Sequence, residues 1–195
     1  MKKTYAIAAA LALLASCRSV TYEDVNPTIQ PNQNLLPVLD VRPDQSSIRA
    51  VYNKKKDDRI ADALSIFNKE VRENIIEQTG DKKGIITMRI NYGNTTHNKF
   101  YQATPALIYI PTILGVPFDS AEQTLDIEVL IQNTHKDVIK RYTSNSSDTV
   151  YAALYWGYDN KDIDRKVAAE NLKKALENIR HQINNDAPEI RSKLK

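Results

Sequence analysis

The residues that could do chemistry are few and widely spaced along this chain of 195 residues. His97, His135 and His181 are separated by 38 and 46 residues, so no pair has the short spacing typical of metal ligands. The sequence contains no nucleophile elbow, no glycine-rich phosphate loop and no His-Glu-x-x-His motif. We therefore expect a protein that is not an enzyme, without catalytic residues, metal or cofactor. A hydrolase whose site is assembled only in three dimensions is the alternative.

Cys17 is the single cysteine, which excludes an internal disulfide and a metal site built from cysteines. Lys2 and Lys3 precede an apolar run of ten residues, 6–15, and the small residues Ala15 and Ser16 come directly before Cys17. This is the layout of a secretory signal. The apolar run is too short to cross a bilayer, which takes about 20 residues. An exported protein with one unpaired thiol is unusual, so Cys17 needs a specific explanation.

The residues Leu14-Ala15-Ser16-Cys17 resemble the lipobox of bacterial lipoproteins, in which the cysteine is acylated and becomes the first residue of the mature chain. The resemblance implies that residues 1–16 are a lipoprotein signal peptide and that Cys17 is lipidated, for example with palmitate. The membrane is then a partner through this anchor. The next residue is Arg18 rather than Asp, which by resemblance to enterobacterial sorting favours the outer membrane, with the protein facing the periplasm.

Charge argues against nucleic acid as a partner. Removal of residues 1–16 leaves 25 basic and 24 acidic residues, a nearly neutral balance, whereas nucleic-acid binders concentrate basic residues on one face. Residues 17–36 are polar and contain Pro27 and Pro31, which predicts a flexible tether after the acylated cysteine. Residues 37–187 are long enough for one domain with a proper core. Residues 188–195 are predicted to be a charged, frayed tail.

Hydrophobic periodicity predicts two long helices. The first begins at Asp57 or Asp58, ends near Thr79 and places an apolar residue at every third or fourth position; the second ends near Asn184, before Pro188. Alternating patterns predict strands over residues 85–92 and 125–132, and a hairpin partner over 138–143. A short first strand is expected at 35–41, a loop at 93–102 and a polar break at 144–147. Together these elements predict an α/β (α+β) two-layer sandwich, with a mixed sheet of about four to five strands packed by two long helices.

Three features together resemble a group of small bacterial envelope lipoproteins that carry a TolB-N-terminal-like or transport-auxiliary α/β domain. They are the broken apolar segment Ile110-Pro111-Thr112-Ile113-Leu114-Gly115, the hairpin after it, and the tyrosine-rich stretch before the final helix. The resemblance covers residues 37–185. It implies an accessory role in envelope assembly or transport rather than catalysis.

Two surfaces are candidate binding sites. The apolar segment 105–118 admits three interpretations: part of the core, a protein-binding surface, or a loop in contact with lipid headgroups. The partner-binding hypothesis rests on Tyr109, Ile110, Ile113 and Leu114. The second candidate is an aromatic cluster that either covers the sheet edge and the last helix or stacks on sugars; it comprises Tyr151, Tyr155, Trp156 and Tyr158.

The sequence therefore favours a membrane-anchored accessory lipoprotein that binds another envelope protein. A surface glycan-binding lipoprotein is the alternative. Neither the identity of a ligand or partner nor the oligomeric state follows from the residues.

Overall fold

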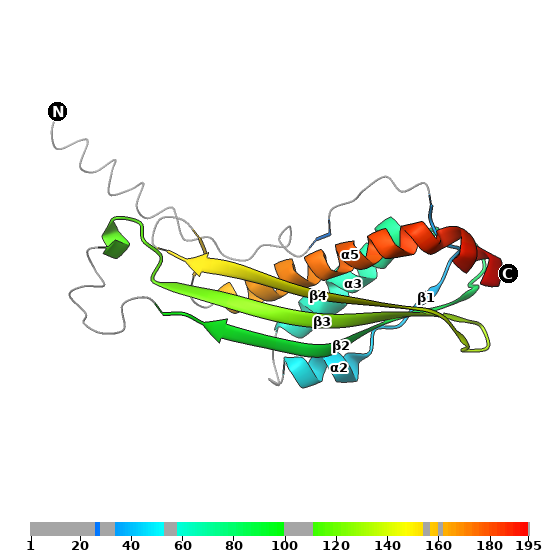
Figure 1. The fold of residues 1–195 in the computed structure, drawn as a ribbon, viewed down its shortest axis with the longest axis horizontal. Coiled ribbons are helices and arrows are strands. Elements are labelled where there is room, and N and C mark those ends of the chain that lie inside the picture. Colours follow the sequence, from blue (N-terminus) through cyan, green and yellow to red (C-terminus); the bar gives the residue numbers. More distant parts are fainter. Residues whose placement is uncertain are drawn as a thin grey trace, which may run out of the picture.

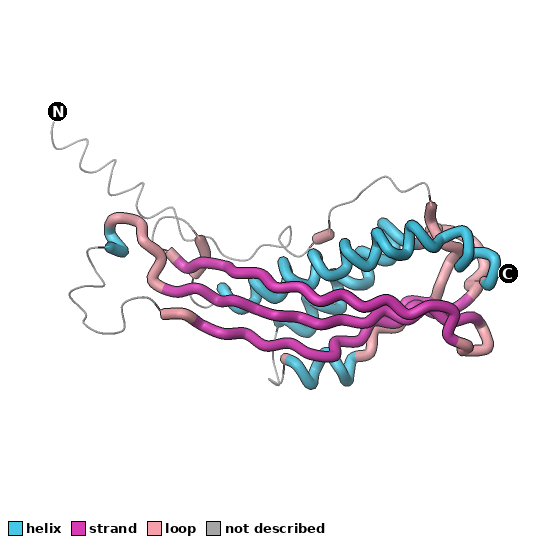
Figure 2. Tube along the Cα trace, viewed as in Figure 1, coloured by secondary structure: helices cyan, strands magenta, loops and turns pink. Residues whose placement is uncertain are grey.

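The computed structural model describes residues 26–27, 34–52, 58–99, 111–153, 157–159 and 162–194. A four-stranded sheet with the order β1-β2-β3-β4 forms one layer of this part of the chain. The strands are β1 (Asp40–Val41), β2 (Gly84–His97), β3 (Asp119–Asn133) and β4 (Val138–Ala152). β1 is parallel to β2, and the other neighbours are antiparallel. The predicted α+β sandwich with a mixed sheet is confirmed (Figures 1 and 2).

Helices α3 (Asp58–Glu70) and α5 (Ile163–Lys193) form the second layer and cover one face of the sheet (Figure 1). Apolar residues recur every three or four positions along the two helices and at every second position along β3, so each element turns an apolar face to the others. α3 ends in a π-helical turn, η2 (Val71–Ile75), earlier than the predicted end near Thr79. The core between the layers contains Ile66, Phe67, Leu125, Ile127, Val129, Ile131, Leu172, Leu176, Ile179 and Ile183.

The opposite face of the sheet, called here the outer face, is polar. Cross-strand pairs that include Ser120–Tyr151, Glu122–Thr149 and Thr124–Ser147 alternate with the core-facing pairs. Because successive strand residues point to opposite sides, the apolar residues of β3 lie against the helices and these polar residues point away from them.

The first strand is shorter than predicted. Residues 35–41 form one isolated parallel bridge, Leu36 to Ile76, and only two residues of β1 pair with β2. Pro37 has no backbone N–H for a ladder, which explains the interruption. The unpredicted helix α2 (Gln45–Val51) follows. Asp44 caps it by accepting hydrogen bonds from the Ser46 and Ser47 backbone amides, at 3.0 and 3.4 Å.

α2 lies beside the edge of β2, and residues at its start form hydrogen bonds with backbone groups of that edge. The Asp44 backbone N–H donates to the Met88 carbonyl at 2.8 Å, and the Ile90 N–H donates to the Ser47 hydroxyl at 3.1 Å. Gly93 allows the close approach, because a Cβ at this position would lie 2.5 Å from a methyl carbon of Val51.

Two polar stretches expected to interrupt strands are strand instead. Residues 93–97, where a loop was predicted to start, belong to β2, and β4 passes through residues 144–147 without a break. Residues 100–102 of the predicted loop lie outside the described residues. Both corrections have the same cause: the neighbouring β3 supplies the backbone hydrogen bonds. On the core side of β4, the Ser146 hydroxyl donates to the Asn171 carbonyl of α5 at 3.2 Å, so small polar residues fit under the helix.

The last helix continues beyond the predicted end near Asn184 and contains Pro188. A proline inside a helix costs about 3 kcal/mol, because it removes one backbone hydrogen bond and crowds the preceding turn. Ala187, Ile190 and Leu194 are buried in the core, and their packing offsets this cost. The residues expected to fray are therefore part of the folded body as far as Leu194.

Candidate functional site

Several residues singled out by the sequence lie outside the described part of the chain. They are Cys17, Tyr109, Ile110, Tyr155 and Trp156. The structure places the remaining four, Ile113, Leu114, Tyr151 and Tyr158, at the end of the sheet where β3 begins and β4 ends.

A hydrogen-bonded turn over residues 111–116, called here the apolar turn, displays the first pair of residues. Gly115 N–H donates to the Thr112 carbonyl at 3.0 Å, and Val116 N–H donates to the Pro111 carbonyl at 2.9 Å. Ile113 is 59% exposed and Leu114 is 77% exposed. The turn lies at the end of the molecule opposite the C-terminus (green in Figure 1). These two side chains therefore do not belong to the core.

The two members of the predicted aromatic cluster that the structure describes, Tyr151 and Tyr158, do not form a common platform. Tyr151 is 42% exposed and pairs with Ser120 on the outer face. Tyr158 is bound to the same strand, since its N–H donates to the Tyr151 carbonyl at 3.2 Å. Its ring, however, lies toward α5, where the Lys166 ammonium is 5.2 Å from the ring centroid. Of these two tyrosines, Tyr151 alone lies on the outer face of the sheet.

A polar groove of about 450 Å³ lies beside Tyr151 and is called here the outer-face groove. β2, β3, β4 and the residue after β2 contribute to its lining, which comprises Thr96, His97, Asn98, Ser120, Glu122, Thr149 and Tyr151. Spacing of two along β3 and β4 places Ser120 with Glu122, and Thr149 with Tyr151, on one face. That spacing was visible in the sequence, but the pairing of the three strands was not.

His97 also contacts two carboxylates on the core side of this end of the sheet. Its Nδ1 lies 3.5 Å from Asp119 Oδ2, and its Nε2 lies 2.8 Å from Asp164 Oδ1. These contacts connect β2, β3 and α5. Within the described residues, no group of three His, Cys, Asp or Glu side chains has a geometry that could hold a metal ion.

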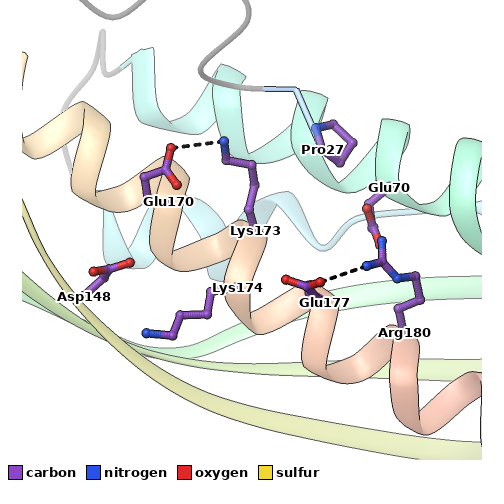
Figure 3. A pocket seen from close by; sticks show the side chains of 8 residues that line it. All are labelled: Pro27, Glu70, Asp148, Glu170, Lys173, Lys174, Glu177 and Arg180. Atoms are coloured by element: carbon purple, nitrogen blue, oxygen red, sulfur yellow. Dashed lines mark hydrogen bonds and ion pairs between the residues drawn. The ribbon is translucent and has the colours of Figure 1, made fainter. Parts of the chain in front are cut away.

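A second polar cavity, of about 370 Å³, lies on the helical layer and is called here the helical-layer pocket (Figure 3). Its lining residues come from α3, α5, β4 and the chain before β1: Pro27, Glu70, Asp148, Glu170, Lys173, Lys174, Glu177 and Arg180. Its lining side chains carry charges of both signs, and two ion pairs form within α5. Lys173 pairs with Glu170 at 3.1 Å, and Arg180 pairs with Glu177 at 3.2 Å.

A buried ion pair forms one wall of the helical-layer pocket. Arg180 Nη1 donates to Glu70 Oε1 at 2.8 Å, and the Asn74 amide donates to the other carboxylate oxygen at 2.7 Å. Burial raises the pKa of the Glu70 carboxyl above its usual value, although the bonds from Asn74 and Arg180 act in the opposite direction. The wall is thus a structural link between α3 and α5, and these residues showed no signal in the sequence.

No protein-family model matches the chain, and the search of curated proteins returns no match. The comparison with solved structures finds, among others, a candidate lipoprotein from Caulobacter crescentus CB15 and a minor lipoprotein from Acinetobacter baumannii. The first has a TM-score of 0.34 and 9% identity, and the match covers 87% of this chain and 92% of that one. The second has a TM-score of 0.31 and 9% identity, with coverages of 83% and 96%.

Among the described helices, none combines the length and apolar composition needed to cross a membrane.

Proposed function

We propose that this protein is a non-enzymatic lipoprotein of the bacterial envelope, anchored through acylated Cys17, whose folded domain binds another envelope protein. Its task is accessory to an envelope assembly or transport complex, and its place is the outer membrane, facing the periplasm. The lipobox-like residues before Cys17 support the anchor. The exposure of Ile113 and Leu114 supports the binding surface.

The apolar turn has the physical properties of a preformed contact. Burial of a large aliphatic side chain that would otherwise face water contributes about 1.5–3 kcal/mol. The hydrogen bonds across residues 111–116 hold the backbone, so less conformational entropy is lost on binding than from an open loop. Phe118 N–H donates to the Ala152 carbonyl at 3.0 Å, which attaches the turn to the sheet.

Photo-crosslinking in intact cells tests this proposal. A photoreactive amino acid replaces Leu114 in one strain and, as a matched control, Val138 in another. Val138 is also an exposed aliphatic residue, at 51%, but it begins β4 at the other end of the hairpin. We expect one discrete protein adduct from position 114, its loss on Ile113→Asp, and no such adduct from position 138.

Unchanged thermal unfolding of the Ile113→Asp protein would show that the fold is intact. Equal crosslinking from positions 114 and 138, or an adduct that survives Ile113→Asp, would contradict the proposed surface.

A second candidate function, the binding of saccharides, is favoured by one observation: the exposed ring of Tyr151 borders the outer-face groove. A tyrosine ring can stack on a sugar face, while hydroxyl, amide and carboxylate groups bind sugar hydroxyls. A soluble-glycan binding assay should show signal that is lost in Tyr151→Ala. Tyr92→Ala is the matched control, because Tyr92 is exposed on the same face and does not line the groove. Equal binding by both variants would exclude this site.

A further inference from the structure

The chain before β1 contacts the folded body at two separate places. At Leu35, the Arg191 guanidinium donates to the carbonyl from Nε at 2.9 Å and from Nη2 at 2.6 Å. The next residue, Leu36, is fully buried, and its backbone bonds to Ile75 and Glu77 at 2.8 and 2.9 Å. Leu35 and Leu36, the last two residues of the predicted tether, are therefore attached to the folded body.

The second contact lies further toward the N-terminus. The Lys69 ammonium donates to the side-chain oxygen of Asn26, and Pro27 is buried beside Glu70 and Arg180 at the helical-layer pocket (Figure 3). Proline suits this place because its fixed φ lowers the entropy lost on docking and because it has no N–H to leave unsatisfied. Pro27 thus packs beside residues of both α3 and α5, and Asn26 accepts one charge-assisted hydrogen bond from α3.

We infer that residues 26–27 form a strap that docks the anchor arm on the α3–α5 layer, so that this layer faces the bilayer and the outer face of the sheet faces away from it. The inference rests on the proposed lipid anchor at Cys17. It concerns a different property, namely how the anchor presents the domain to its partners.

The number of residues between Cys17 and the strap limits how far the domain can stand from the membrane. From Cys17 to Asn26 there are nine residue steps, which span at most about 30 Å at roughly 3.3 Å per residue. If the arm were free as far as Leu36, nineteen steps would span about 63 Å. The docked strap therefore halves the reach of the domain and makes the arm leave from the helical layer. An arm attached only at Leu36 would allow either face to approach the lipid.

The test is energy transfer to lipid in vesicles of bacterial lipids, with the full-length acylated protein. Because Cys17 is acylated in the proposed anchor, one introduced cysteine is the only thiol available for a donor dye. Lys174→Cys places the dye on the exposed helical layer, and Asn94→Cys places it on the outer face of β2. With an acceptor dye on the lipid headgroups, we expect stronger transfer from position 174 than from position 94.

Disruption of the strap should remove this difference. Lys69→Ala combined with Pro27→Asp removes the bond to Asn26 and places a carboxylate beside Glu70. The matched control is Lys82→Ala, since Lys82 is an exposed lysine that pairs with Asp40, away from the strap. The control should keep the difference between the two dye positions, and the double variant should lose it.

The outcomes separate the strap from the anchor. Protein that floats with the vesicles but shows equal transfer from both positions overturns the strap alone, as does a difference that persists in the double variant. Protein that does not float with the vesicles overturns the anchor, and the inference about orientation fails with it.

Discussion

Replacement of Arg180 by methionine tests whether the buried ion pair links α3 to α5. The side chains of Arg180 and Glu70 are each 4% exposed, and their charged atoms are 2.8 Å apart. Methionine keeps much of the aliphatic volume of arginine but leaves Glu70 without its charged partner. Loss of one member of a buried pair typically costs about 3–5 kcal/mol, a large part of the roughly 5–15 kcal/mol that stabilises a domain.

The destabilisation should depend on pH in a defined direction. Burial raises the folded-state pKa of Glu70 above its usual value of 4.5. A carboxyl of this kind contributes stability below its unfolded pKa, and the contribution is lost as pH rises through the folded pKa. Without Arg180 the folded pKa rises further, and each added unit corresponds to about 1.4 kcal/mol. Arg180→Met should therefore destabilise the protein less at pH 5 than at pH 8.

Urea unfolding at both pH values measures this difference in the wild type, Arg180→Met, Glu70→Gln and the double variant. Glu70→Gln removes the buried charge, so the double variant should be more stable than Arg180→Met at pH 8 and should lose the pH-dependent part of the destabilisation. The pair would not be the link we describe if Arg180→Met costs less than about 1 kcal/mol, below the range for broken buried pairs. Equal destabilisation at pH 5 and pH 8 would refute the role assigned to Glu70.

Three further predictions concern the core, the edge of β2 and the end of α5. Ile190→Ala should lower the free energy of unfolding in urea by about 2–5 kcal/mol, as for a core aliphatic residue, whereas a frayed tail would show almost no change. Gly93→Ala should destabilise the protein by about 1–3 kcal/mol through the clash with Val51, and an unchanged thermal midpoint would contradict the packing of α2. Hydrogen bonds from Lys193 and Lys140 lower the pKa of Glu189 to about 2, so its NMR titration should move upward in Lys193→Ala; an unchanged titration would exclude that contact.

The elements that could be predicted from the sequence are those whose signal is local. Alternation along residues 125–132 indicated β3, and apolar residues three and four apart indicated α3 and α5. The polar residues of β2 and β4 were misinterpreted because their strand conformation depends on pairing with β3. The continuation of α5 through Pro188 was missed for a related reason. The cost of a proline inside the helix is offset by core contacts of Ile190, which depend on the tertiary fold.

The candidate sites were predictable to a smaller extent. Ile113 and Leu114 were selected because an apolar segment broken by proline and glycine is unusual, and the structure shows both side chains exposed. Glu70 and Arg180 are 110 residues apart, and the pair forms only when α3 and α5 pack on the same sheet face. The Asn26–Pro27 contact likewise depends on that packing, so a polar stretch with prolines was interpreted as a free tether along its whole length.

The lipid on Cys17 is the central claim of the proposed function, and the intact mass of the protein extracted from membranes tests it most directly. The account predicts a chain that begins at Cys17 and carries the added mass of two or three acyl chains, and a Cys17→Ser protein without that mass that no longer sediments with membranes. A membrane-associated chain that retains residues 1–16, or one that begins at another residue without lipid, would contradict it.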